Sequence, residues 1–249
     1  EDIKSKITER TKGIVVINPN NPTGAVYPRS VLKQIVDVAR EHGLVVFSDE
    51  IYEKITYDGA EAINMATLTG DDVLCLTFSG LSKAYRVCGY RAGWVAITGP
   101  KKDAASYLEG IHLLASMRLC SNVPAQHAIQ TALGGYQSIN ELIVPGGRLY
   151  EQRTLAHKML NEIDGISCTP ADGALYLFPK IDIERFDITD DEQFALDLLK
   201  SQKILFSHGG AFNWKDPDHF RLVYLPDMQT LSSALERLGN FMADYKQKH

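Results

Sequence analysis

The stretch "GIVVINPNNPTGAVYPRSVLKQIVDVAREHGLVVFSDE", residues 13–50, decides the fold class. Short apolar runs open and close it, at 13–18 and 44–50, and β-branched residues dominate the first. Runs of this kind are typical of buried strands. A strand, a helix and a strand of this total length form a βαβ unit, so we predict that the two strands are parallel.

The segment between the two strands has the pattern of an amphipathic helix. Residues 30–43 are expected to be helical, with Ser30 as the N-cap and Gly43 as the C-terminal stop. One face of this helix collects the apolar side chains, which are Leu32, Ile35, Val36 and Ala39.

The remaining chain continues the α/β pattern and then changes. Two more strands are expected at 72–80 and 93–98, and residues 101–133 are mostly helical in pattern. The segment Pro145-Gly146-Gly147 is a plausible hinge. We therefore predict a large α/β domain with a mostly parallel sheet over residues 1–145 and a smaller α+β domain over 146–249.

The second predicted domain begins with a long helix at 148–163, and another helix follows at 190–202. Residues 166–181 suggest two strands joined by a turn at Asp172-Gly173. Further strands are expected at 203–209 and 219–225, before a final helix from Met228.

Composition limits the possible functions. Of the 249 residues 45% are hydrophobic and 23% charged, and the net charge is −5, which does not suggest a nucleic-acid surface. No apolar run is long enough for a membrane span, and no residue spacing suggests a metal site. Four widely spaced cysteines are expected to be reduced and buried, which favours a cytoplasmic location. They are Cys75, Cys88, Cys120 and Cys168.

Polar residues follow three successive predicted strands. The first strand runs into Asn21, the second ends at Asp49 with Tyr52 just beyond, and the third runs into Ser82 and Lys83. Because ligands of open parallel sheets bind beyond the carboxyl ends of the strands, these side chains indicate a site.

The chemistry of this set points to one cofactor. The amine of Lys83 could form a Schiff base with an aldehyde, and Asp49 could pair with a protonated ring nitrogen. Asn21 and Tyr52 could bind a phenolate oxygen, and Arg91 could bind a phosphate. An aldehyde, a pyridinium, a phenolate and a phosphate together describe pyridoxal phosphate.

Three blocks also resemble a known family. The segments "NPNNPTG", "SDEIY" and "LSKAYRVCGYRAGW" are similar, in order and spacing, to the signatures of fold-type I pyridoxal-phosphate aminotransferases, the aspartate aminotransferase superfamily. The stretches "ASMRLCSNVPAQHAIQTALGGYQSI" and "GALYLFPKID" most resemble bacterial alanine (glutamate–pyruvate) aminotransferases. The resemblance implies transfer of an amino group from alanine to 2-oxoglutarate, giving pyruvate and glutamate, in a homodimer.

The resemblance also implies a role for each residue. Lys83 would hold the cofactor and shuttle a proton, and Asp49 would keep the ring nitrogen protonated. Asn21 and Tyr52 would bind the ring hydroxyl oxygen, and Arg91 would bind the phosphate.

The substrate side rests on later residues. Arg221 matches the family arginine that binds the substrate carboxylate, where Asn21 would also contribute. The Asn21-Pro22 bond is the expected cis bond. Many relatives carry a serine where this chain has Gly80, and either Ser82 or Ser79 is expected to take over part of that contact with the phosphate.

The glycine-rich phosphate loop of the family has no counterpart before residue 13. We therefore expect the chain to be the C-terminal portion of an aminotransferase, which leaves open whether this piece alone is active.

Each feature also has a simpler interpretation. "NPNNPTG" could be a plain turn, Asp49 a solvated strand end, Lys83 and Arg91 surface charges, and Arg221 an outward-facing strand residue. Tyr176 could line the substrate side or pack in the core. Other functions are a fold-type I C–S lyase, the aminotransferase-like effector domain of a transcription regulator, and a folded remnant without function.

Overall fold

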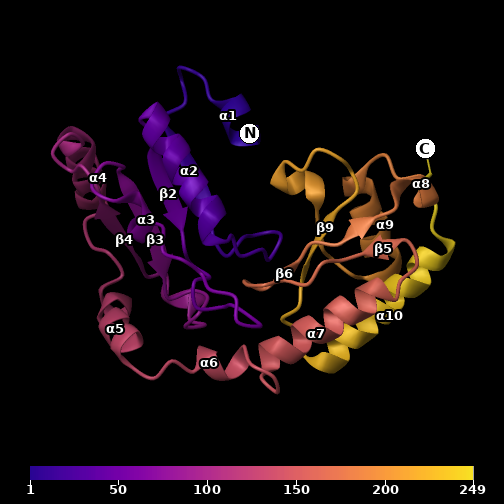
Figure 1. Ribbon diagram of the computed structural model, residues 1–249. Coiled ribbons are helices and arrows are strands. Elements are labelled where there is room, and N and C mark those ends of the chain that lie inside the picture. The colour runs from indigo at the N-terminus through magenta and orange to yellow at the C-terminus, as the bar shows by residue number, and fades with distance from the viewer. Residues whose placement is uncertain (249) are drawn as a thin grey trace. The chain divides into compact units, whose positions relative to one another are not determined.

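The computed structural model describes residues 1–248, which divide into two compact units (Figure 1). Unit 1 comprises residues 1–19, 26–56 and 61–139. Unit 2 comprises residues 20–25 and 57–60 and the chain from Asn140 onward. The boundary predicted after residue 145 therefore lies inside unit 2.

Unit 1 is built on a four-stranded sheet of order β1-β2-β3-β4. The strands β1 and β2 pair in parallel, as the βαβ pattern predicts, and β2 and β3 also pair in parallel. The strand β4 is antiparallel to β3, so the sheet is mostly parallel, as predicted, with one antiparallel edge strand. A parallel pair needs a long crossover, whereas β3 and β4 are joined by a loop with one 3₁₀ turn, η1. The bounds are β1 Gly13–Ile17, β2 Val45–Asp49, β3 Cys75–Gly80, η1 Cys88–Tyr90 and β4 Gly93–Thr98.

The helix α2 (Arg29–His42) covers one face of this sheet (Figure 1). It begins after Pro28, so the prediction of Ser30 as N-cap is wrong, because Ser30 already lies inside the helix. Gly43 ends it in the left-handed conformation, as predicted, with φ 61°. The buried face of α2 packs on the sheet through an apolar core of Val16, Leu32, Ile35, Val36, Ala39, Leu44, Val46, Met65, Val73 and Cys75.

The helical segment predicted at 101–133 consists of two helices. They are α4 (Ala105–Met117) and α5 (Val123–Gly134), and the chain between them includes Leu119 in the left-handed region. No residue of α4 is buried. Unit 1 also contains the short helices α1 (Asp2–Lys6) and α3 (Ala66–Thr69).

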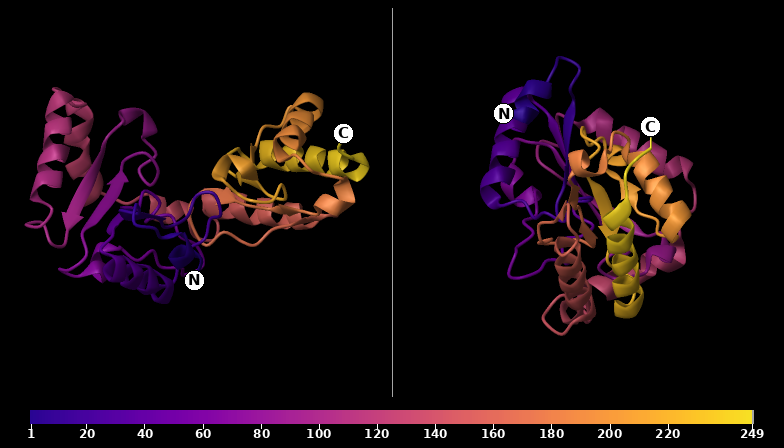
Figure 2. Two further views of the ribbon diagram at one scale, coloured as in Figure 1. Left: turned by 90° about the horizontal axis from the view of Figure 1, so that it is seen from above. Right: turned by 90° about the vertical axis from the view of Figure 1, so that its right-hand side faces the viewer.

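Unit 2 has two long helices, α7 (Arg148–Asn161) and α10 (Met228–Asp244), which lie side by side (Figure 1 and Figure 2). The sequence pattern predicts both. A three-stranded sheet has the order β6-β9-β8, and a two-stranded sheet pairs β5 with β7. The strands are β5 Ile166–Ser167, β6 Tyr176–Leu177, β7 Lys180–Ile181, β8 Ser207–His208 and β9 Phe220–Val223. The remaining elements are α6 Ile139–Leu142, α8 Ile183–Phe186, α9 Asp191–Gln202 and η2 Gly209–Phe212.

The range 166–181, predicted to contain two strands, contains three short ones. The strands β5 and β7 lie on either side of the predicted turn and pair with each other, antiparallel, whereas β6 pairs with β9. The loop at Asp172-Gly173 is held by other segments, since the Gly173 N–H donates to the Gly24 carbonyl and the Tyr57 N–H to the Asp172 carbonyl. These hydrogen bonds direct β6 away from a local hairpin.

All four cysteines are free thiols, but they are not all buried. Cys75 and Cys168 are buried as predicted, and burial raises the pKa of Cys168 to about 12. Cys88 and Cys120 are exposed, because they lie on the η1 turn and on the segment between α4 and α5. Among residues 1–248, no helix is both long and apolar enough to cross a membrane.

Candidate active site

The end of β2 presents two carboxylates to different surroundings. Glu50 is 2% exposed and accepts hydrogen bonds from the Ser48 hydroxyl, the Asn64 amide and the Met65 N–H. Burial raises the pKa of this carboxyl group. Asp49 is half-buried and accepts from the Ile51 N–H at 3.1 Å through Oδ1. Glu50 therefore fixes the strand end, and Asp49 is the carboxylate that can meet a ligand.

Lys83 lies in the loop that follows β3. Backbone hydrogen bonds close this loop, from the Leu81 N–H to the Ala92 carbonyl and from the Arg86 N–H to the Lys83 carbonyl. The Lys83 amine lies 5.6 Å from the centre of the Tyr52 ring, and Tyr52 is 3% exposed. The structure thus brings Lys83 and Tyr52 together, as the motif spacing suggests.

Gly80 occupies the position where many relatives have serine. A Cβ atom at this position would lie 2.9 Å from the Ala92 carbonyl oxygen and 3.1 Å from the Gly93 Cα. Because the start of β4 lies this close to residue 80, a side chain larger than that of glycine would clash there. Ser82, two residues later, is half-buried.

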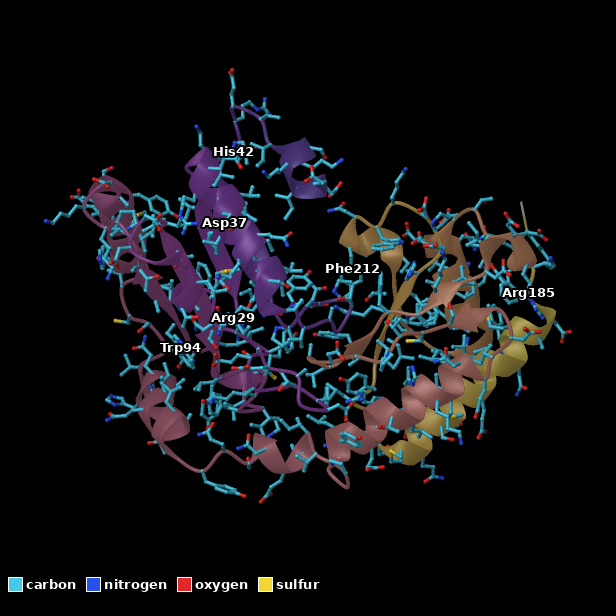
Figure 3. The ribbon with its side chains drawn as sticks, in the orientation of Figure 1. Arg29, Asp37, His42, Trp94, Arg185 and Phe212 are labelled. Carbon is cyan, nitrogen blue, oxygen red and sulfur yellow. The ribbon has the colours of Figure 1, made fainter. Side chains whose placement is uncertain are left out.

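Arg91 lies between η1 and β4, three residues before Trp94, which is in β4 (Figure 3). It is exposed, with φ 48°, and one Nη1 N–H donates to the Cys88 carbonyl at 2.7 Å. A guanidinium carries five N–H groups, so it has donors left for a phosphate.

A shallow pocket of about 400 Å³ lies beside Asp49 in unit 1. Its walls are Val15, Phe47, Asp49, Ile51, Phe78 and Ser79. The rings of Phe47 and Phe78 stack with centroids 6.5 Å apart. Apolar walls with one carboxylate suit a flat aromatic ring that carries a protonated nitrogen, such as the pyridine ring of pyridoxal phosphate. Lys83, Tyr52 and Arg91 do not line this pocket, so the fit concerns Asp49 alone.

Asn21 and Arg221 belong to unit 2, where they contact each other. The Arg221 Nη1 donates to the Asn21 Oδ1 at 2.9 Å, and Nη2 donates to the Ser207 hydroxyl at 3.3 Å. The Asn21-Pro22 bond is cis, as predicted, and Asn18-Pro19 is a second cis bond that we did not predict. Arg221 is therefore not a solvated strand charge.

Arg221 has three further contacts that the sequence motifs do not predict. The rings of Tyr176 and Phe212 lie 4.6 and 4.8 Å from the guanidinium carbon, and Ser207 accepts its hydrogen bond. Tyr176 is 7% exposed and its ring lies against the guanidinium, so it is packed in the core and also adjoins the predicted carboxylate-binding residue. The pattern "FSHGGAF" carries no signal that would link it to Arg221, because the link depends on the pairing of β8 with β9.

The predicted site residues therefore form two groups, one in each unit. Unit 1 contains Lys83, Asp49, Tyr52, Ser82 and Arg91, and unit 2 contains Asn21 and Arg221.

Two histidines of unit 2, His208 and His219, contact nearby carboxylates. His208 contacts Asp191 on α9 at 3.3 Å, and His219 contacts Asp218 at 2.6 Å. Within residues 1–248, no group of three or more His, Cys, Asp or Glu side chains could hold a metal ion.

Comparisons with known proteins identify the family. The family described as aminotransferase class I and II matches residues 1–238. The chain belongs to this aminotransferase family. Aminotransferases of this class, and the fold-type I proteins of similar structure, use pyridoxal phosphate.

Two curated aminotransferases are similar along almost the whole chain. An alanine aminotransferase of Mycobacterium tuberculosis is 63% identical over 99% of this chain. A glutamate–pyruvate aminotransferase, AlaA, of Escherichia coli is 58% identical over 99%. The chain spans 57% and 61% of the lengths of these two relatives.

Solved structures agree with this aminotransferase fold. An aminotransferase from Escherichia coli matches with a TM-score of 0.97 at 57% identity, covering 99% of this chain and 61% of that one. An alanine aminotransferase from Pyrococcus furiosus matches with a TM-score of 0.89 at 41% identity, covering 98% and 60%.

Proposed function

We propose that this protein transfers the amino group between L-alanine and 2-oxoglutarate, with pyruvate and glutamate as products. The observation that carries the proposal is the 63% identity with an alanine aminotransferase over 99% of this chain. The apolar pocket beside Asp49 and the Arg221 guanidinium, which is held by Asn21, support this chemistry.

Pyridoxal phosphate would be the cofactor. When bound, it supplies an aldehyde that captures an amine and a ring that withdraws electrons from the substrate Cα. The Lys83 amine would bind at the aldehyde carbon and move the proton at the substrate Cα. Asp49 would hold the proton on the ring nitrogen, and Arg91, assisted by Ser82, would bind the phosphate.

The remaining residues would bind oxygen atoms. Tyr52 and Asn21 would donate hydrogen bonds to the phenolic oxygen of the ring, while Arg221 and Asn21 would hold the substrate carboxylate. A guanidinium suits this last task, because its planar fork can bind both carboxylate oxygens.

Reductive labelling tests the cofactor assignment. The chain is titrated with pyridoxal phosphate, reduced with borohydride, digested and mapped by mass spectrometry. We expect the pyridoxyl group on Lys83. The matched control is Lys33→Arg, an exposed position on α2, which should leave the labelling unchanged, whereas Lys83→Arg should abolish it. Label spread over surface lysines, with none on Lys83, would contradict the assignment.

Product analysis tests the reaction itself. With L-alanine and 2-oxoglutarate we expect pyruvate and glutamate in equal amounts, and Lys83→Ala should lower the rate roughly 10²–10⁴-fold. Release of a thiol from a sulfur-containing amino acid, without glutamate formation, would support a C–S lyase instead. Binding to DNA in place of turnover would support a regulator.

We also propose that the protein is a homodimer that works in the cytoplasm. The dimer is supported by the apolar side chains that α4 leaves exposed, and the location by the two exposed free thiols Cys88 and Cys120.

A further inference from the structure

Arg221 is held by hydrogen bonds that occupy only part of its guanidinium. Asn21 takes one N–H of Nη1, and Ser207 takes one N–H of Nη2. Each terminal nitrogen carries two N–H groups, so each has a second donor for a ligand. Two parallel donors on adjacent nitrogens match the two oxygens of a carboxylate.

Two aromatic rings contact the same guanidinium. Its central carbon lies 4.6 Å from the centre of the Tyr176 ring and 4.8 Å from the centre of the Phe212 ring. A ring attracts a cation through its π face, and this contact uses no N–H group. The rings can therefore restrict the orientation of the guanidinium while its donors stay available to a ligand.

The two rings are anchored in different ways. Tyr176 is buried on β6 and pairs with Val223 of β9, so its position is part of the sheet. Phe212 ends the η2 turn (Figure 3) and packs edge-on against Phe178, with centroids 6.3 Å apart. Phe212 is half-buried, which makes it the ring that can be changed with the smaller effect on the core.

We propose that Phe212 is a positioning residue which, with Tyr176, holds Arg221 in the orientation that binds the carboxylate of an amino acid or 2-oxo acid. The proposal rests on the proposed function, because that function supplies the carboxylate ligand. Phe212 acts through Arg221. Its loss should leave the arginine present but free to adopt several rotamers, and binding one carboxylate geometry should then cost more conformational entropy.

The test follows the reactivity of Arg221 and needs no cofactor. The chain is treated with phenylglyoxal, which modifies arginine, and the extent at Arg221 is measured by peptide mass spectrometry with and without 2-oxoglutarate. In the wild type we expect slow modification and protection by 2-oxoglutarate. In Phe212→Leu we expect Arg221 to react about threefold faster, and protection to need about threefold more 2-oxoglutarate.

Three further variants separate orientation from general damage. Phe212→Trp keeps a ring and should restore wild-type behaviour. Phe212→Met keeps most of the side-chain volume without a ring and should behave like Phe212→Leu. It replaces Phe212→Leu if the leucine variant does not fold. Phe178→Leu removes a ring from the same cluster, one that contacts Phe212, Trp214 and His219. Because it loosens the packing of Phe212 but keeps the ring on Arg221, it should change the reactivity of Arg221 less than Phe212→Leu does.

The proposal is overturned if the ring-free variants react and are protected like the wild type, or if Phe178→Leu changes Arg221 as much as Phe212→Leu does. Absence of protection in the wild type also overturns it. These outcomes are independent of labelling at Lys83, so failure of the cofactor assignment and failure of this inference are distinguishable.

Discussion

Asp218 contacts three side chains of unit 2 through a single carboxylate. It is 7% exposed and accepts a hydrogen bond from the Trp214 indole at 2.9 Å and one from His219 at 2.6 Å. The Lys180 amine on β7 lies 3.3 Å away. Burial acts to raise the pKa of Asp218, but the hydrogen bonds from His219 and Trp214 and the positive charges outweigh it and lower the pKa.

This lowered pKa makes the stability of unit 2 depend on pH. Because the folded-state pKa lies below the unfolded value of about 3.9, the carboxylate stabilises the fold fully above that value, and the contribution is lost as the pH falls through the folded-state pKa. We expect Asp218→Asn to lower the free energy of unfolding by about 1–3 kcal/mol at pH 5 and by less at pH 3. Urea denaturation at the two pH values measures both differences.

Asp216→Asn is the matched control, because it removes the same charge from an exposed position two residues away. It should change the unfolding free energy by less than about 0.5 kcal/mol at either pH. A loss in Asp218→Asn that is the same at both pH values would show that the ionised form of Asp218 is not what stabilises the loop.

Individual site residues differ in how far the sequence predicts them. Lys83 and Asp49 follow apolar strands, so motif and position suffice to select them. Glu50 lies one residue from Asp49, but its neighbour Met65 comes from a separate segment, so its burial is not visible in the pattern. The same is true of Ser207, whose contact with Arg221 depends on strand pairing.

At the scale of single elements, Gly24 and Gly43 show how a turn is constrained by its surroundings. Both have positive φ, at 73° and 61°. A Cβ on Gly24 would lie 2.5 Å from the Ala171 Cβ and 2.6 Å from the Tyr176 carbonyl oxygen, whereas a Cβ on Gly43 would meet no atom within 4 Å. Gly24 therefore meets both a conformational and a packing requirement, and Gly43 meets the first alone.

We expect Gly43→Ala to cost about 1 kcal/mol of unfolding free energy, since it introduces a left-handed alanine. Gly24→Ala should cost about 2–4 kcal/mol, because overpacking adds to the same backbone strain. Chemical denaturation of the two variants measures the comparison. Equal losses would mean that the segment 20–25 can move away from the 171–176 loop at little cost.

Elements with strong local patterns are the ones that the sequence predicts best. The helix α2 has a full amphipathic repeat and a glycine stop, and its C-terminus is found where expected. The strands β5 to β8 are two residues each, too short for a periodic signal, and the partner of β6 is β9, which lies beyond α8, α9 and β8 in the sequence. The direction of β4 is set by the loop between β3 and β4, which contains no crossover helix. The residues of β4 alone do not indicate this direction.

At the scale of the whole molecule, α4 raises the question of what covers its apolar side chains. The sequence leaves core packing and self-association equally open for this helix. None of its residues is buried, and Leu114 and Met117 are 69% and 77% exposed. Exposed apolar groups at this density mark an interaction surface, and the proposed homodimer supplies a second copy as its partner.

We expect light scattering to give a mass of twice 27.7 kDa for the chain at micromolar concentration. A double variant, Leu114→Lys with Met117→Lys, should be monomeric, since association would bury two unpaired charges in an apolar contact. Leu205→Lys is the matched control, because it places the same charge on an apolar residue that is 77% exposed but lies in unit 2. It should remain dimeric. If the wild type is monomeric, or if Leu205→Lys dissociates it as readily as the α4 variant, then α4 is not the dimer contact.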